Sequence, residues 1–123
     1  VFGKYITPSR VYPSCTRPSA YAKKGTLSSF VLGHEPKKFV VVYPFTKTRE
    51  WYLLPQPQRQ KMMDQHISVS EKYPQVILNT TYSFGIGDQD FMLAFECDNL
   101  RDFQNLIMDL RQTKVSTYVA VDT

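Results

Sequence analysis

The sequence predicts an α+β fold, because segments with the residue pattern of β-strands alternate with segments that have the spacing of amphipathic helices. Residues 39–43, of Val and aromatic residues, and residues 91–95, which begin and end with Phe, are short apolar runs typical of buried strands. Residues 100–110 instead carry apolar side chains three and four positions apart. A length of 123 residues suits one domain with its own hydrophobic core.

The first strand is predicted over residues 39–43, which read Phe-Val-Val-Val-Tyr. We expect Pro44 to end this strand. The residues around Arg49 and Trp51 are expected to form a loop that leads into the next element.

A helix is predicted over residues 57–73. Pro55 and Pro57 stand where prolines suit the start of a helix, and we expect Pro74 to end it. One face of this helix collects residues at helical spacing, namely Met62, His66, Val69 and Tyr73.

Two strands follow, over residues 76–84 and 90–97, and a turn at residues 85–88 joins them. Asp98 or Asn99 can cap the next helix. The buried stripe of that helix is expected to consist of Leu100, Phe103, Leu106, Ile107 and Leu110.

Residues 115–121 are expected to form the last strand, which makes the order of elements β-α-β-β-α-β. This order defines the ferredoxin-like unit. Its strands normally lie in the order 4-1-3-2, with the first and third strands central. The first and third strands here are the two with uninterrupted apolar runs, which supports the assignment.

The central strands are apolar on both faces, yet two helices cover only one face of a four-stranded sheet. We therefore expect residues 38–123 to be one half of an α+β barrel, whose second face is covered by another half or by a partner chain. Residues 1–37 are rich in Pro, Ser and Tyr, and we expect them to be the end of an incomplete N-terminal half and a linker.

Composition excludes several classes of protein. The formal net charge of +4 comes from the front of the chain, but the sequence lacks the interleaved aromatic and basic residues of a nucleic-acid-binding surface, so no nucleic acid is expected. The apolar runs are too short to span a membrane. Cys15 and Cys97 have neither zinc-ribbon nor thiol-redox spacing, and such cysteine use favours a reducing, cytoplasmic location.

The chain contains two histidines in different settings. His34 lies in a Gly-His-Glu-Pro turn and is expected to be exposed. His66 lies on the apolar face of the helix predicted over residues 57–73, where a buried imidazole needs a hydrogen-bond partner or a metal. Either a core histidine with a hydrogen-bond partner or an axial haem ligand fits this pattern, whereas a zinc site lacks further ligands at the required spacing.

Tyr43 and Lys47 stand at the end of a central strand, where sheet-based folds often place reactive side chains. A phenol beside an ammonium can hold a carboxylate, and a tyrosine close to an oxidising metal centre can carry a radical. A core tyrosine and an exposed lysine remain the simpler interpretation. Neither a Ser-His-Asp order nor a Gly-rich phosphate loop occurs, which argues against hydrolases and kinases.

The whole chain resembles the chlorite dismutase-like family, and most of all the actinobacterial form of its coproheme decarboxylase branch. The resemblance rests on residues 43–55 (YPFTKTREWYLLP), 59–66 (RQKMMDQH), 73–74 (YP) and 82–85 (YSFG). It implies a dimeric α+β barrel of two ferredoxin-like halves, a homo-oligomer, and a porphyrin ligand that is haem b or coproheme III with its iron.

The resemblance also implies roles for individual residues. His66 corresponds to the proximal iron ligand, Tyr43 to the tyrosine that becomes a radical, and Lys47 to the lysine near the reacting propionate. The implied reaction uses hydrogen peroxide to convert two propionates of coproheme III to vinyl groups with loss of carbon dioxide, which yields haem b. The residues that hold the porphyrin are then expected to be His66, Arg111, Ser116, Phe45 and Met62.

Two departures from the family bear on catalysis. The stretch that carries the distal Arg of chlorite dismutases includes Leu78 and Asn79 here, so chlorite dismutation is not expected. The distal His of the actinobacterial branch aligns with Thr26, and His34 is the other candidate. A non-catalytic haem-binding or structural member of the same fold is therefore the alternative to the enzyme.

Overall fold

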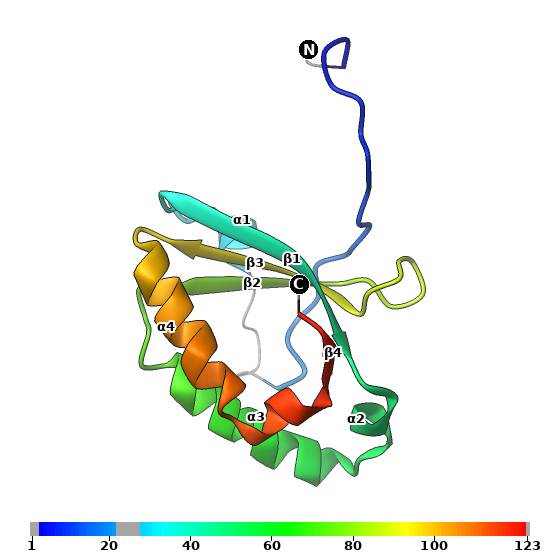
Figure 1. Cartoon of the computed structure of the whole chain (residues 1–123), viewed down its shortest axis with the longest axis vertical. Coiled ribbons are helices and arrows are strands. Elements are labelled where there is room, and N and C mark those ends of the chain that lie inside the picture. Colours follow the sequence, from blue (N-terminus) through cyan, green and yellow to red (C-terminus); the bar gives the residue numbers. More distant parts are fainter. Residues whose placement is uncertain (1–2, 22–27, 123) are drawn as a thin grey trace.

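The computed structural model describes residues 3–21 and 28–122. Its centre is an antiparallel sheet with the strand order β2-β3-β1-β4 (Figure 1). This is the 4-1-3-2 order of a ferredoxin-like unit, read from the opposite edge, so the predicted fold class is confirmed. The strands are β1 (Phe39–Lys47), β2 (Ile77–Tyr82), β3 (Phe91–Cys97) and β4 (Val119–Val121).

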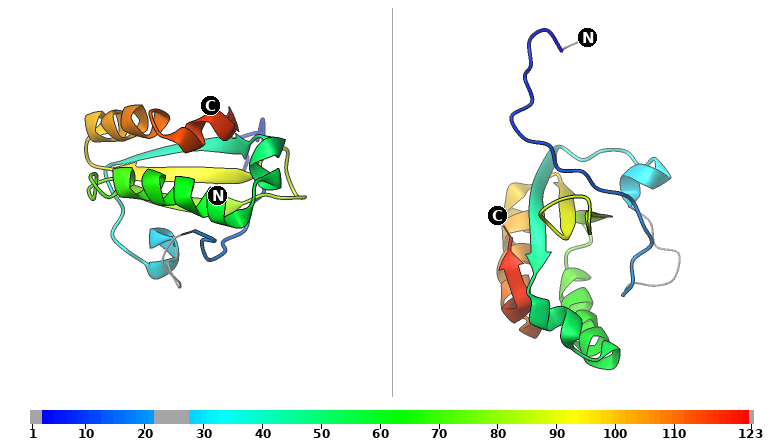
Figure 2. Two further views of the ribbon diagram at one scale, coloured as in Figure 1. Left: turned by 90° about the horizontal axis from the view of Figure 1, so that it is seen from below. Right: turned by 90° about the vertical axis from the view of Figure 1, so that its right-hand side faces the viewer.

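The helices that follow the strands in the sequence lie together on one face of the sheet. The helical segments are α1 (Ser29–Leu32), α2 (Arg49–Leu53), α3 (Gln56–Ser70), α4 (Leu100–Arg111) and the 3-10 helix η1 (Lys114–Tyr118). Seen from below, α3 and α4 lie side by side, and β1 and β3 show between them (Figure 2, left). Helix α4 contacts β3, whereas the main contacts of α3 are with α4 and η1.

The start of the described chain takes no part in this layer. It starts away from the sheet as an extended arm and runs toward it, reaching β2 (Figure 1). Cys15 forms an isolated bridge with Tyr82, and α1 contacts the same edge strand. The division of the chain at residue 37 stays a prediction.

Strand β1 runs through Pro44 to Lys47, so the expectation that Pro44 ends it was wrong. Proline is tolerated here because β4 pairs with β1 only at Thr46 and Lys47. Among the described residues no strand pairs with this side of Pro44, so its missing N–H costs no ladder bond there. The predicted loop at residues 49–51 was also wrong, since these residues belong to α2.

The remaining boundaries differ in smaller ways. Helix α3 ends at Ser70 rather than at Tyr73, and Glu71 and Lys72 form a turn before Pro74. Only the last three residues of the strand predicted over residues 115–121 are extended, because η1 precedes them. Asn99 is the N-cap of α4, with its side chain accepting a bond from the backbone N–H of Arg101 at 2.9 Å.

Strand register sorts the side chains of the sheet onto two faces, because residues paired across antiparallel strands point the same way. The helix-covered face collects one apolar cluster, made of Leu93, Phe95 and Leu106 with neighbours from β1 and α4. Leu100 was expected in this stripe but is 43% exposed. On the opposite face, called the far face below, Val40 and Val42 are each 57% exposed. These exposed apolar side chains agree with the expectation that something covers the far face. Whether another ferredoxin-like half or a partner chain covers it stays a prediction.

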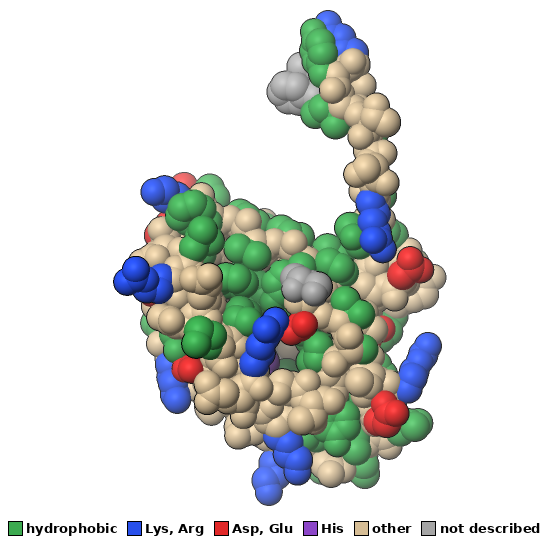
Figure 3. All heavy atoms as spheres, in the orientation of Figure 1, with side chains coloured by type: hydrophobic (Ala, Val, Ile, Leu, Met, Phe, Trp, Pro, Cys, Tyr) green, Lys and Arg blue, Asp and Glu red, His purple; other side chains and the backbone are tan. Residues whose placement is uncertain are grey.

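Hydrophobic side chains also gather on the surface in the middle of the view in Figure 3, between the strands above and the helices below. Within the described segments, no helix combines the length and hydropathy needed to span a bilayer.

Candidate functional site

Tyr43 lies on the helix-covered face of β1. Its ring stacks on Phe95, with the ring centroids 5.8 Å apart. Burial raises the pKa of Tyr43 to about 12, and the Asp122 carboxylate adds to this effect while Arg111 opposes it. The phenol therefore keeps its proton at neutral pH, and its ring is held by the main apolar cluster.

Lys47 is the last residue of β1 and points to the same face as Tyr43, four positions earlier. Its ammonium lies over two aromatic rings, 4.7 Å from the centroid of Trp51 and 5.3 Å from that of Phe45. Burial lowers the pKa of Lys47 to about 8, because an ammonium loses hydration in this environment. Lys47 is thus a half-buried cation, and the simpler interpretation of an exposed lysine was wrong.

His66 is half-buried on α3, and its Nδ1 atom is buried without a hydrogen-bond partner. Burial, with a contribution from the positive charge of Lys47, lowers the pKa of His66 to about 4. The imidazole is therefore neutral at physiological pH, and its electrostatic coupling to Lys47 places the two side chains in one region. The sequence also allowed a core histidine with a hydrogen-bond partner, but the buried Nδ1 atom of His66 has no such partner.

Arg111 and Ser116 lie on α4 and η1, the elements that lead into β4. Arg111 ends α4 and forms an ion pair with Asp122, Nη2 to Oδ2, at 3.3 Å. The Ser116 hydroxyl, in η1, donates to the carbonyl oxygens of Arg111 and Thr113 at 2.8 and 2.7 Å. Since both charges of the ion pair act on the pKa of Tyr43, this corner is electrostatically joined to the phenol.

Phe45 and Met62 belong to two different apolar clusters. Phe45 packs with the cluster under α4, where its ring centroid lies 6.2 Å from that of Phe91. Met62 is 6% exposed and packs against Trp51 and Val115. Phe45 is thus one of the two rings that the Lys47 ammonium contacts. Met62 packs against Trp51, which is the other.

The structure separates the two residues that aligned with the distal Arg. Leu78 pairs with Phe95 and so lies on the helix-covered face, although it is 44% exposed. Asn79 pairs with Ala94 and points to the far face, where it is 1% exposed. Asn79 is therefore not on the side of Tyr43 and His66. Thr26 lies outside the described residues, and His34 is exposed.

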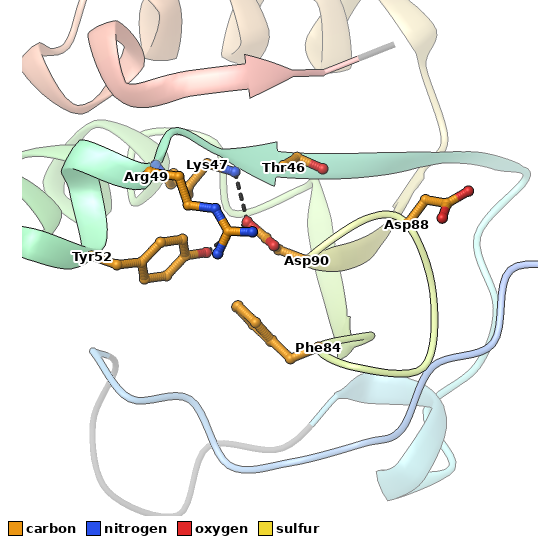
Figure 4. Close-up of a pocket in the computed structure, with 7 residues that line it drawn as sticks. All are labelled: Thr46, Lys47, Arg49, Tyr52, Phe84, Asp88 and Asp90. Atoms are coloured by element: carbon orange, nitrogen blue, oxygen red, sulfur yellow. Dashed lines mark hydrogen bonds between the residues drawn. The ribbon is translucent and has the colours of Figure 1, made fainter.

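Asp90 and Tyr52 were not expected at the site. They line a cavity of about 350 Å³ whose wall consists of Thr46, Lys47, Arg49, Tyr52, Phe84, Asp88 and Asp90 (Figure 4). The Oδ2 atom of Asp90 accepts hydrogen bonds from the Lys47 backbone N–H at 2.9 Å and from the Tyr52 hydroxyl at 2.7 Å. The sequence signal for Asp90 is weak, namely an acid directly before an apolar strand.

Across residues 3–21 and 28–122, no three His, Cys, Asp or Glu side chains come together as a metal site. From the described residues, a metal bound in this region would therefore have fewer than three ligands of these types and would need further coordination from a cofactor. A porphyrin supplies coordination of this kind.

Comparison with known proteins matches the model of the family described as chlorite dismutase to residues 1–123. The chain is 36% identical over 107 residues to the coproheme decarboxylase of Mycolicibacterium smegmatis, and this match covers 87% of the chain and 46% of the relative. It is 29% identical over 125 residues to the chlorite dismutase of Ideonella dechloratans, which covers 95% and 44%.

A solved structure of a chlorite dismutase variant from Candidatus Nitrospira defluvii has the same fold. The TM-score is 0.72 at 27% identity, and the match covers 87% of this chain and 48% of that one. The chain thus spans about half the length of the relatives it matches.

Proposed function

The chain belongs to the chlorite dismutase family, and from this premise we propose that it holds an iron porphyrin through His66 and supports peroxide-dependent decarboxylation of coproheme III to haem b. The observation that carries the proposal is the His66 ring, which is neutral and half-buried with an unpaired buried nitrogen, in one region with Tyr43 and Lys47. The coproheme decarboxylase relative favours this branch of the family.

The residues present fit an iron porphyrin. An iron ligand must be a neutral imidazole, and the low pKa of His66 supplies one at physiological pH. Helix α3 has its main contacts with α4 and η1 rather than with the strands, so His66 stands on a helix that has few contacts with the sheet. A flat apolar group between α3 and β1 would meet the rings of Tyr43 and Phe45 on the strand side.

Tyr43 is proposed to lose a hydrogen atom to the oxidised cofactor and then to oxidise a propionate. The bound iron porphyrin, with hydrogen peroxide, supplies the oxidising power. Because its pKa is about 12, Tyr43 keeps its hydroxyl hydrogen at neutral pH and has a hydrogen atom to lose. It then takes a hydrogen atom from the β-carbon of a propionate. The propionate loses two electrons in each round, one with the hydrogen atom that Tyr43 takes and one as the bond to the carboxylate breaks. Each round thus converts one propionate, one hydrogen peroxide and one proton to a vinyl group, carbon dioxide and two waters.

Lys47, Arg111 and Ser116 are proposed to hold propionates. With a pKa of about 8, the Lys47 amine is mostly protonated at neutral pH and attracts a carboxylate from a half-buried position. Arg111 can exchange its exposed partner Asp122 for a propionate, because an exposed ion pair contributes little stability. The Ser116 hydroxyl donates to backbone carbonyls in this structure, and we propose that it turns its hydrogen to a propionate oxygen when the porphyrin is bound.

The alternative is a haem-binding member of the family that does not decarboxylate. Leu78 favours it, because the helix-covered face carries an apolar side chain where chlorite dismutases have their distal Arg. Without a guanidinium there, chlorite has no anion clamp, and we do not propose chlorite dismutation. In both versions we propose a cytoplasmic homo-oligomer in which another ferredoxin-like half covers Val40 and Val42 on the far face.

One titration separates the two versions. Coproheme is added to the protein, hydrogen peroxide is titrated in, and the porphyrin is followed by mass spectrometry. Stepwise loss of two carboxyl groups as carbon dioxide supports the decarboxylase. Bleaching of the porphyrin without these mass changes supports the non-catalytic binder, and failure to bind coproheme contradicts both.

A further inference from the structure

We propose that Asp90 is a positioning residue for Lys47, a role that rests on the proposed function of Lys47 as a propionate-binding cation. The Oδ2 atom of Asp90 accepts the backbone N–H of Lys47 at 2.9 Å, while the backbone N–H of Asp90 donates to the carbonyl of Phe45 at 3.2 Å. Asp90 therefore binds β1 at the residues on both sides of Thr46, and Figure 4 shows its side chain beside Lys47.

The need for this contact follows from how the ladder ends. Strands β1 and β3 pair in register as far as Phe45 and Phe91. On the other side of β1, pairing with β4 shifts register between Thr46 and Lys47. Neither neighbouring strand thus holds Lys47 in a regular ladder. The Asp90 carboxylate adds one more bond beyond the last pair and fixes the backbone from which the Lys47 side chain starts.

A second element fixes Asp90 itself. The Tyr52 hydroxyl, on α2, donates to the same Oδ2 atom at 2.7 Å. Burial raises the pKa of Tyr52, and the hydrogen bond to Asp90 adds to the effect, so this phenol stays a donor. Helix α2 also carries Trp51, whose ring lies under the Lys47 ammonium. Asp90 therefore ties the backbone of Lys47 to the helix that supports its side chain.

The chain offers a matched control in Asp88. It is an acid of the same turn and lines the same cavity, but it is exposed and has no hydrogen bond to β1 in the described structure. Asp90→Asn keeps an acceptor oxygen without the charge, and Tyr52→Phe removes only the hydroxyl. These gentler variants remain informative if Asp90→Ala does not fold.

The first test measures binding of metal-free coproporphyrin III by fluorescence. We expect Asp90→Ala to weaken binding about fivefold, the size of one hydrogen bond, with Tyr52→Phe and Asp90→Asn intermediate and Asp88→Ala unchanged. In a Lys47→Ala background, Asp90→Ala should have no further effect, because Asp90 acts only through Lys47. The tetramethyl ester of the porphyrin, which has no carboxylates, should bind all variants equally.

Unchanged binding in Asp90→Ala, or an equal loss with and without Lys47, would overturn the proposal. The second test needs no porphyrin: Asp90→Ala should accelerate amide hydrogen exchange at Lys47, and Asp88→Ala should not. If coproporphyrin binds no variant, the proposed function fails, and the exchange rate still decides whether Asp90 holds Lys47. An unchanged exchange rate would contradict the positioning role.

Discussion

Buried polar groups on the two faces of the sheet differ in how they are satisfied. On the far face, Asn79 accepts from the Ser29 backbone N–H at 2.6 Å and donates to Glu96 at 2.7 Å. Glu96 also accepts from the Ser29 hydroxyl and the Lys37 backbone N–H. On the helix-covered face, Nδ1 of His66 is buried and unpaired, and the Lys47 ammonium contacts aromatic rings.

The difference teaches how to tell structure from function in this molecule. A satisfied polar network stabilises a fold, and here it docks the start of α1 on β2 and β3. A buried group left without partners costs stability and is retained where something else uses it. Removing polar groups from the far face should therefore lower the free energy of unfolding. Removing them from the helix-covered face should instead reduce porphyrin binding or decarboxylation.

The largest effect is expected for His66→Ala. We expect loss of the ferric spectrum that coproheme shows when His66 ligates its iron, because no other side chain of α3 carries an imidazole. The free energy of unfolding without porphyrin should change by less than about 1 kcal/mol, since Nδ1 has no bond to lose. An absorption spectrum and a urea titration measure both, and an unchanged spectrum would assign the iron to another ligand.

Tyr43→Phe should separate binding from turnover on the same face. The substitution keeps the ring that stacks on Phe95 and removes the hydroxyl, so we expect an intact Soret band and no decarboxylation in the peroxide titration. Mass spectrometry of the porphyrin gives the second result. Full activity in this variant would exclude Tyr43 as the radical, and a lost Soret band would mean that the ring position itself had changed.

Asn79→Ala tests the far face. It leaves the Ser29 N–H and one oxygen of Glu96 short of a partner in a buried place, so we expect a loss of about 2–3 kcal/mol in the free energy of unfolding. Gln112→Ala is the control, because its side chain is exposed and makes one long bond of 3.4 Å, and it should cost under about 0.5 kcal/mol. If the Soret band of Asn79→Ala changed as much as that of His66→Ala, the claim that far-face polar groups act on stability alone would be wrong.

The fold could be predicted because its signals are local. The apolar runs of β1 and β3 and the stripe of α4 each fit in one short window of sequence. Helix α2 has five residues, too few for a helical period to be recognised, and its Trp51 was therefore assigned to a loop. These errors moved element boundaries without changing the strand order.

The site could be predicted in part. Helical spacing placed His66 on the inner face of α3, and the end of a central strand drew attention to Tyr43 and Lys47. The sequence indicated the stretch of Leu78 and Asn79 but not which of the two faces the site, because a shift of one residue in a strand reverses the face. Asp90 could not be predicted, since its role exists only where the ladder of β1 stops.

The smallest effect is expected for the pH dependence of the far face. Burial opposes ionisation of Glu96, but bonds from Lys37, Ser29 and Asn79 outweigh it and hold its pKa below the usual value. The unfolded chain therefore takes up a proton near pH 4.5, before the folded one does, and stability should fall as pH drops below that value. One group limits the slope to about 1.4 kcal/mol per pH unit. Urea titrations of wild type and Glu96→Gln at pH 3.5–6 should converge at the acid end, and parallel curves would show that the network does not depend on the charge.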